Sequence, residues 1–98
     1  MPGSKRAVRA ALRDILEKQI EADDPPEVKA TFNRLRRDGE STETTWRLLS
    51  AVLMLELWEI LRTEREFDRA RYVAHLHALP TLPRELGDDA SGASEAGA

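Results

Sequence analysis

The chain has 98 residues, 34% of them charged, with a formal net charge of −3 at pH 7 and no cysteine. This length suits one domain, and a chain without cysteine has no disulfide bridge, zinc–thiolate site or thiol nucleophile. The longest nearly unbroken apolar run, residues 48–55, is far shorter than the ~20 apolar residues that a membrane-spanning helix needs. The start of the chain has no apolar run of signal-peptide length, so we expect a cytoplasmic protein that is not embedded in a membrane.

The first predicted helix covers about residues 5–22 and begins with basic side chains. The first 13 residues contain four basic residues and no acidic one. Apolar side chains recur at helical spacing and predict one inward stripe. This stripe consists of Val8, Ala11, Leu12 and Ile15, with Leu16 at its flank. Pro25 and Pro26 end the helix, because proline lacks an amide donor and clashes with the preceding turn.

The second helix has the clearest start signal in the chain. Asp24 is placed as the N-cap, Pro25 at the first helical position and Glu27 at the third, which is the spacing of a capping box. Gly39 is placed to end the helix in a left-handed conformation. The predicted inward stripe is Val28, Thr31, Phe32 and Leu35.

The third helix begins after Ser41 and runs to about Arg62. On a helical wheel at ~100° per residue, one broad arc holds Trp46, Leu49, Leu53, Leu57, Ile60 and Leu61. Much of the other side is filled by Leu48, Ala51, Met54, Leu55 and Trp58. Glu56 and Glu59 lie in a narrow polar strip between them. A helix that is apolar around most of its circumference is either central to a bundle or shared with a second chain.

The fourth helix covers about residues 69–79, and Pro80 follows it. Asp68 is placed as its N-cap, with Phe67 and Tyr72 at the two positions of a hydrophobic staple. The core contacts expected from this helix are Val73, Leu76 and Leu79.

Residues 87–98 contain only glycine, alanine, serine, aspartate and glutamate. Such a segment cannot bury enough apolar surface to offset the entropy lost on ordering, so we expect a disordered acidic tail. Residues 1–86 are expected to form a single helical domain. We predict an all-α fold, a small and mostly antiparallel four-helix bundle.

Patterns for catalysis or metal binding are weak. Glu56 and Glu59 face the same way, but the Glu-x-x-His motifs of di-iron bundles are missing. His75 and His77 are two residues apart on a helix and diverge, so they cannot share a metal ion. We expect no enzyme activity and no cofactor. The two glutamates are expected to pair with arginines or to face solvent, and a carboxylate metal site remains a minor alternative.

Nucleic-acid binding is the main alternative to a protein interface. A helix-turn-helix built from the second and third helices fails, because a recognition helix exposes polar side chains to base edges and the third helix presents leucines. A non-specific phosphate site remains open on the basic first helix, through Arg6, Arg9 and Arg13. A second basic set consists of Lys29, Arg34, Arg36 and Arg37.

The favoured hypothesis is a non-enzymatic protein–protein interaction or homodimerisation module that uses the third helix. One arc of this helix suffices to close the bundle, which leaves the other side without an evident partner in the same chain. Tryptophan and methionine beside arginine are typical of interface cores. The predicted interface residues are Leu48, Ala51, Met54, Leu55, Trp58 and Arg62.

The chain resembles a helical segment of bacterial proteins of unknown function over about residues 24–80. The resemblance rests on Asp24-Pro25-Pro26-Glu27-Val28, Leu35, Gly39, Leu57-Trp58-Glu59, the run from Phe67 to Val73, and Leu79-Pro80. It implies a cap, a glycine turn, an acidic apolar helix and a final capped helix with tyrosine, and it implies no activity. Some relatives carry histidines near the start of the third helix, where this chain has Thr44, Thr45 and Trp46, so the resemblance implies no metal site here.

Overall fold

The computed structural model describes residues 4–84 and residue 86. This part of the chain forms four helices, α1 (Ser4–Ala22), α2 (Pro26–Arg37), α3 (Thr42–Thr63) and α4 (Arg69–Ala78). The predicted all-α fold with four helices is therefore confirmed, and each helix lies close to its predicted bounds. The predicted acidic tail, residues 87–98, lies outside the described residues.

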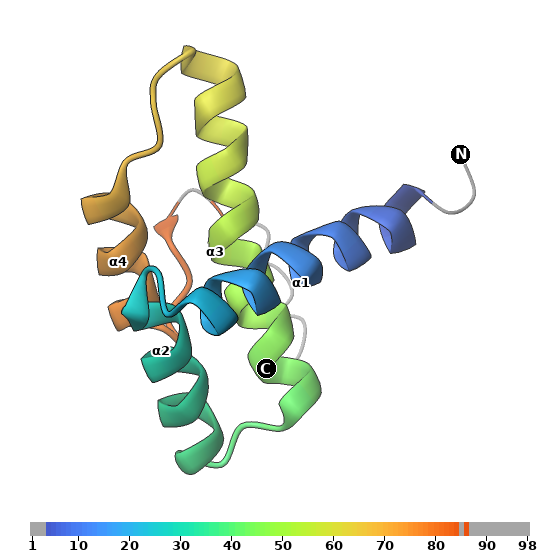
Figure 1. Ribbon diagram of the computed structural model, residues 1–98, viewed down its shortest axis with the longest axis vertical. Coiled ribbons are helices and arrows are strands. Elements are labelled where there is room, and N and C mark those ends of the chain that lie inside the picture. The colour runs from blue at the N-terminus through green and yellow to red at the C-terminus, as the bar shows by residue number, and fades with distance from the viewer. Residues whose placement is uncertain (1–3, 85, 87–98) are drawn as a thin grey trace.

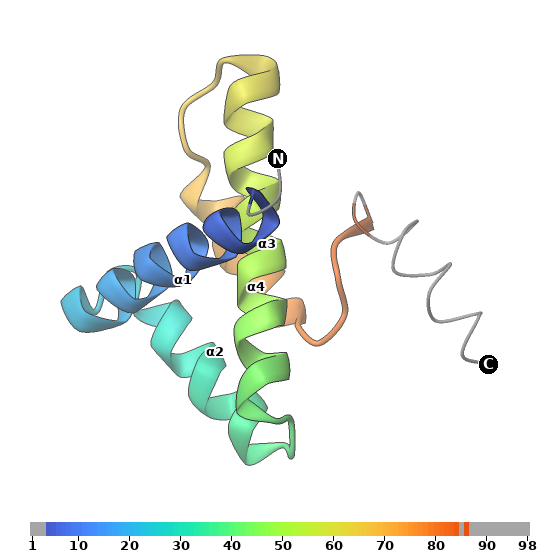
Figure 2. The same ribbon diagram turned by 90° about the vertical axis from the view of Figure 1, so that its right-hand side faces the viewer.

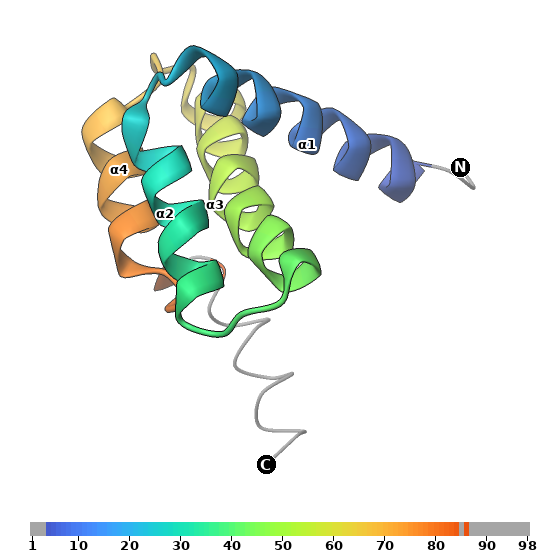
Figure 3. The same cartoon turned by 60° about the horizontal axis from the view of Figure 1, so that its bottom comes forward.

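The helices α2, α3 and α4 lie side by side and alternate in direction along the chain (Figures 1 and 3). Short connections between successive helices favour such antiparallel neighbours. Helix α1 packs on α2 and α3, but it runs across α3 rather than along it (Figure 2). Its amino-terminal half extends past the other three helices (Figures 1 and 3). Helix α3 is central, because α1, α2 and α4 all pack against it.

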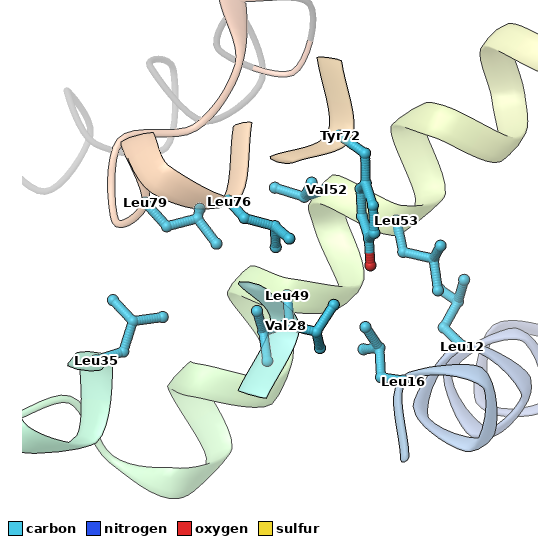
Figure 4. Close-up of a cluster of buried hydrophobic side chains, with 10 residues drawn as sticks. All are labelled: Leu12, Leu16, Val28, Leu35, Leu49, Val52, Leu53, Tyr72, Leu76 and Leu79. Carbon is cyan, nitrogen blue, oxygen red and sulfur yellow. The ribbon is translucent and has the colours of Figure 1, made fainter. Parts of the chain in front are cut away.

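The core is one cluster of buried apolar side chains between the four helices (Figure 4). Its members are Leu12, Leu16, Val28, Leu35, Leu49, Val52, Leu53, Tyr72, Leu76 and Leu79. The predicted stripe of α2 is confirmed, since its positions are buried at Val28, Thr31 and Leu35 and half-buried at Phe32. Each helix contributes to the cluster, so these contacts hold all four helices together.

The predicted stripe of α1 is wrong in part. Leu12 and Leu16 are buried, whereas Val8 is 41% exposed and Ile15 is 37% exposed. Ala11 is exposed as well. The whole stripe would be buried only if α1 lay along the other helices for its full length. Because α1 crosses α3 instead, its amino-terminal turns extend past α2, α3 and α4, the other helices of the described residues (Figure 1).

Local capping explains how α2 ends and α3 begins. The Ser41 hydroxyl oxygen accepts a 3.0 Å hydrogen bond from the backbone N–H of Thr44 and caps α3. Gly39 follows α2 with a φ of +103°. The backbone N–H of Glu40 then donates to the carbonyl of Leu35 at 3.0 Å, as in a Schellman motif. The predicted end of α2 and start of α3 are confirmed.

The start of α2 differs by one residue from the predicted capping box. Pro25 is the N-cap, with φ −75° and ψ 145° and no side-chain cap, and Pro26 is the first helical residue. A proline disfavours helical backbone angles at the residue before it. Pro26 therefore keeps Pro25 extended, and the N-cap lies one residue later than predicted. Asp24 instead pairs with Arg69 at the start of α4, with 2.9 Å between Oδ1 and Nη1.

Both predicted features at the start of α4 are confirmed. The carboxylate of Asp68 accepts a 3.0 Å hydrogen bond from the backbone N–H of Arg71. The rings of Phe67 and Tyr72 pack edge-to-face, with centroids 5.3 Å apart, and form the hydrophobic staple. The buried Tyr72 hydroxyl donates a 2.9 Å hydrogen bond to Oε1 of Gln19. This bond links α4 to α1.

Tyr72 should ionise only when the protein unfolds. Burial raises the pKa of its phenol above the ordinary value of ~10. Because the pKa is raised in the folded state, this group stabilises the fold below pH ~10, and the contribution is lost as the pH rises further. Tyr72 is the only tyrosine of the chain, so phenolate absorbance should appear together with loss of helical circular dichroism.

The control for this titration is the protein unfolded in urea, in which the phenol should ionise near pH ~10. Ionisation near that pH in the native protein, with the helical signal unchanged, would show that the phenol is not buried as described.

Candidate protein interface on helix α3

Most of the circumference of α3 is covered by the rest of the chain. Its buried residues are Thr45, Leu49, Val52, Leu53, Leu55, Glu56 and Glu59. Near its amino terminus, the ring of Trp46 lies 4.9 Å from the ring of Phe32 on α2. The guanidinium of Arg13 on α1 stacks over the same indole at 4.3 Å. Trp46 is half-buried and joins three helices of one chain.

The remaining side of α3 carries large apolar side chains that the chain leaves exposed. Met54 is 40% exposed, Trp58 is 52% exposed and Leu61 is 79% exposed. Spacings of four and three residues place them on one face of the helix. We call Met54, Trp58 and Leu61 the α3 stripe. Single exposed apolar residues are common, but several on one face together with a tryptophan are typical of a contact surface.

The six residues predicted for the interface differ in how far they are exposed. The exposed ones are Met54, Trp58 and Arg62, and the half-buried ones are Leu48 and Ala51. Leu48 packs against the core cluster. Leu55 is only 3% exposed, so its assignment to the interface is wrong. On the helical wheel Leu55 lies beside Glu59 and Val52, which are buried too, so the chain covers a wider arc of α3 than we predicted.

Leu61 is the member of the α3 stripe that the sequence places in the inward arc. The structure leaves it on the surface because α3 has 22 residues, whereas α2 has 12 and α4 has 10. The last turns of α3 extend beyond the point where α1 crosses it (Figure 1). The predicted helix bounds already show this mismatch in length, but they do not show at which end of α3 the uncovered residues lie.

Trp58 is held by a neighbouring arginine. The guanidinium carbon of Arg62 lies 5.0 Å from the ring centroid of Trp58, at cation–π distance. The same guanidinium donates from Nη2 to Oε1 of Glu59 at 2.7 Å. The charge of Arg62 is thus balanced within the chain. The indole has a restricted orientation before any partner arrives, which lowers the entropy lost on binding.

Glu56 lies inside the protein and binds residues of α4. Its side chain is 0% exposed. Arg71 donates to both carboxylate oxygens, from Nε at 3.0 Å and from Nη2 at 3.1 Å. Nδ1 of His75 is 3.6 Å from Oε2. The hydrogen bond to Glu56 is the main cause of the raised pKa of Arg71. This cluster joins α3 to α4 beneath the surface.

Both carboxylates of the predicted polar strip therefore pair with arginines, as expected. The metal alternative requires the carboxylates of Glu56 and Glu59, but Arg71 binds both oxygens of Glu56 and Arg62 binds Oε1 of Glu59. His75 points to Glu56 while His77 is exposed, so the two imidazoles diverge. Within residues 4–84 and 86, no three histidine, aspartate or glutamate side chains are grouped as metal ligands.

The basic residues of α1 are exposed but differ in their partners. Nε of Arg13 lies 3.3 Å from Oε2 of Glu17, and Nζ of Lys18 lies 3.3 Å from Oδ2 of Asp14. In the described part of the chain, the cations nearest the amino terminus have no such acidic partner: Lys5, Arg6 and Arg9. Nucleic-acid binding through these residues stays a prediction.

Comparison of the chain with known protein families, with curated proteins and with solved structures gave no match. Among the described helices, none combines the length and apolarity needed to cross a lipid bilayer.

Proposed function

We propose that this chain is a homodimerisation module that buries the α3 stripe against a second copy of itself. The observation that carries the proposal is Trp58, which is 52% exposed at the centre of the stripe and stacked by Arg62. Tryptophan and arginine are enriched among the residues that dominate the binding energy of protein interfaces. The proposed role is association, without a catalytic step.

The energetics favour a second copy as the partner. In a two-fold symmetric dimer, the same patch of each copy takes part in the contact. One modest apolar patch per chain is therefore buried twice when the dimer forms. Full burial of a side chain such as Leu61 or Met54 contributes ~1.5–3 kcal/mol. Because Glu59 balances Arg62 within the chain, closing the contact buries no unpaired charge. A domain of 98 residues buries a limited fraction of its surface, and association adds to that burial.

Replacing Trp58 by glutamate should convert the dimer into a folded monomer. The new carboxylate would be buried without a partner in the apolar contact. Gel filtration with light scattering should give the wild-type chain twice the monomer mass of 11.1 kDa. Trp58→Glu should give the monomer mass with unchanged helical circular dichroism.

Ala74→Glu is the matched control, because it places the same charge on the exposed face of α4 and should leave the dimer intact. The proposal fails when the wild-type chain stays monomeric up to its solubility limit. It also fails when Trp58→Glu keeps the dimer mass.

A further inference from the structure

The amino-terminal turns of α1 form a helical projection that no other described segment of the chain, within residues 12–84 and 86, covers. All residues of this segment, 5–11, are exposed, and we call it the α1 arm. It extends past α2, α3 and α4 in two views (Figures 1 and 3). Short helices are marginal in water and owe most of their stability to packing of an apolar face. A partner that packed on the apolar face of the α1 arm would therefore stabilise this part of the helix.

That face continues the apolar line that α1 uses in the core. Leu12 and Leu16 are buried and four residues apart, and Val8 lies four residues before Leu12 on the same side of the helix. Val8 is nevertheless 41% exposed, and Ile15 at the flank of the line is 37% exposed. Phosphate binding by the arm would use its cations and would leave this apolar line uncovered.

The apolar line of α1 matches the α3 stripe in length. Val8 and Ile15 are seven residues apart, as are Met54 and Leu61. At 1.5 Å per residue, each pair spans about 10 Å of helix. Two helices packed in opposite directions would therefore place Val8 opposite Leu61 and Ile15 opposite Met54.

The charges at the ends of the two helices favour the same direction. The arm carries Lys5, Arg6 and Arg9 with no acidic residue, and all three are exposed. The segment that follows α3, residues 64–68, contains three acidic residues and one basic residue, all exposed. Arg62 and Thr63 separate Leu61 from this segment. An arm that lies on the stripe with its amino terminus toward residues 64–68 brings cations to acids.

The arm cannot reach the stripe of its own chain. Helix α1 crosses α3, and its amino-terminal end then extends away from α3 and from the α3–α4 connection (Figures 1 and 3). A second copy has no such restriction. We infer that the α1 arm of one copy, together with Ile15, packs antiparallel on the α3 stripe of its partner, and that the partner's arm does the same in return. This inference rests on the proposed homodimer.

Disulfide cross-linking tests the register of this contact, because the chain has no cysteine of its own. We expect Val8→Cys protein mixed with Leu61→Cys protein to form a covalent dimer under mild oxidation. Ile15→Cys mixed with Met54→Cys should do the same. The mismatched pair, Val8→Cys with Met54→Cys, should cross-link at least several-fold less, because the two positions lie at opposite ends of the contact.

Cross-linking of Leu61→Cys protein with itself, without cross-linking to Val8→Cys, would overturn the inference. It would show that two α3 stripes pack on each other, and the homodimer would stand. A monomer mass in light scattering would instead remove the homodimer itself. The two failures are therefore distinguishable.

Charge reversal on the arm separates a protein partner from a nucleic acid. Lys5→Glu with Arg9→Glu should raise the dimer dissociation constant about tenfold, since two rim charges are reversed on each arm and four in the dimer. A dimer that is unaffected by this double substitution, while binding of a labelled DNA duplex at low salt is lost, would overturn the inference and assign the arm to nucleic acid.

Discussion

Replacing Arg71 by leucine should lower the free energy of unfolding by about 3 kcal/mol. The substitution leaves the carboxylate of Glu56, which is 0% exposed, without its bidentate partner. Loss of one partner of a buried pair is costly because the remaining charge stays desolvated. We take the lower end of the usual range because the Arg71 side chain is 33% exposed and water screens part of the interaction. Urea unfolding followed by circular dichroism measures the change.

The double variant Arg71→Leu with Glu56→Leu is the control that assigns this loss to the charge. Removing both charges leaves apolar side chains of similar volume, so most of the lost stability should return. A double variant as unstable as Arg71→Leu alone would show that the arginine acts through packing of its alkyl chain. A domain at the low end of the usual range, about 5 kcal/mol, would keep about 2 kcal/mol after the single substitution, and about 3% of its chains would then be unfolded.

Replacing Leu49 by alanine should cost about 3 kcal/mol of stability. Leu49 is 0% exposed and belongs to the cluster that joins all four helices. Truncation removes buried methyl groups and leaves a cavity that close-packed neighbours fill only in part. The midpoint of urea unfolding should therefore fall, with no change in the slope of the transition.

Leu61→Ala is the matched control on the same helix. Leu61 is 79% exposed, so its side chain buries little apolar surface within one chain. Its truncation should change the free energy of unfolding by less than about 0.5 kcal/mol. Both substitutions are best measured in the Trp58→Glu background, where dimer contacts do not contribute. A similar loss of unfolding free energy for Leu49→Ala and Leu61→Ala would mean that the last turns of α3 are covered within the chain. The α3 stripe would then not be an exposed surface.

The two leucines show that position on a helical wheel does not by itself separate core from surface in this protein. Both lie in the inward arc of the helical wheel, yet one is in the core and the other on the surface. The wheel assumes that a neighbour covers an arc along the whole helix. In this chain α1 crosses α3, so an arc that is inward near the crossing is outward near the end of α3 (Figure 1).

The helices and most of their ends follow from local chemistry and could be predicted from the sequence. Ser41 caps α3 through an amide three residues on, Gly39 takes a positive φ, and Asp68 caps α4 in the same way as Ser41. Each of these contacts joins residues that are neighbours along the chain. The inward side of α2 was predictable for the same reason, since a short helix packed along its neighbours follows simple periodicity.

The burial of Glu56, the burial of Leu55 and the exposure of Val8 and Leu61 could not be predicted in this way. Glu56 reads as part of a solvated strip, but Arg71, fifteen residues later, meets it inside the protein. Such outcomes depend on the angle at which α1 crosses α3 and on how far α3 extends beyond its shorter neighbours. These are properties of packing between distant segments, and helical periodicity carries no information about them.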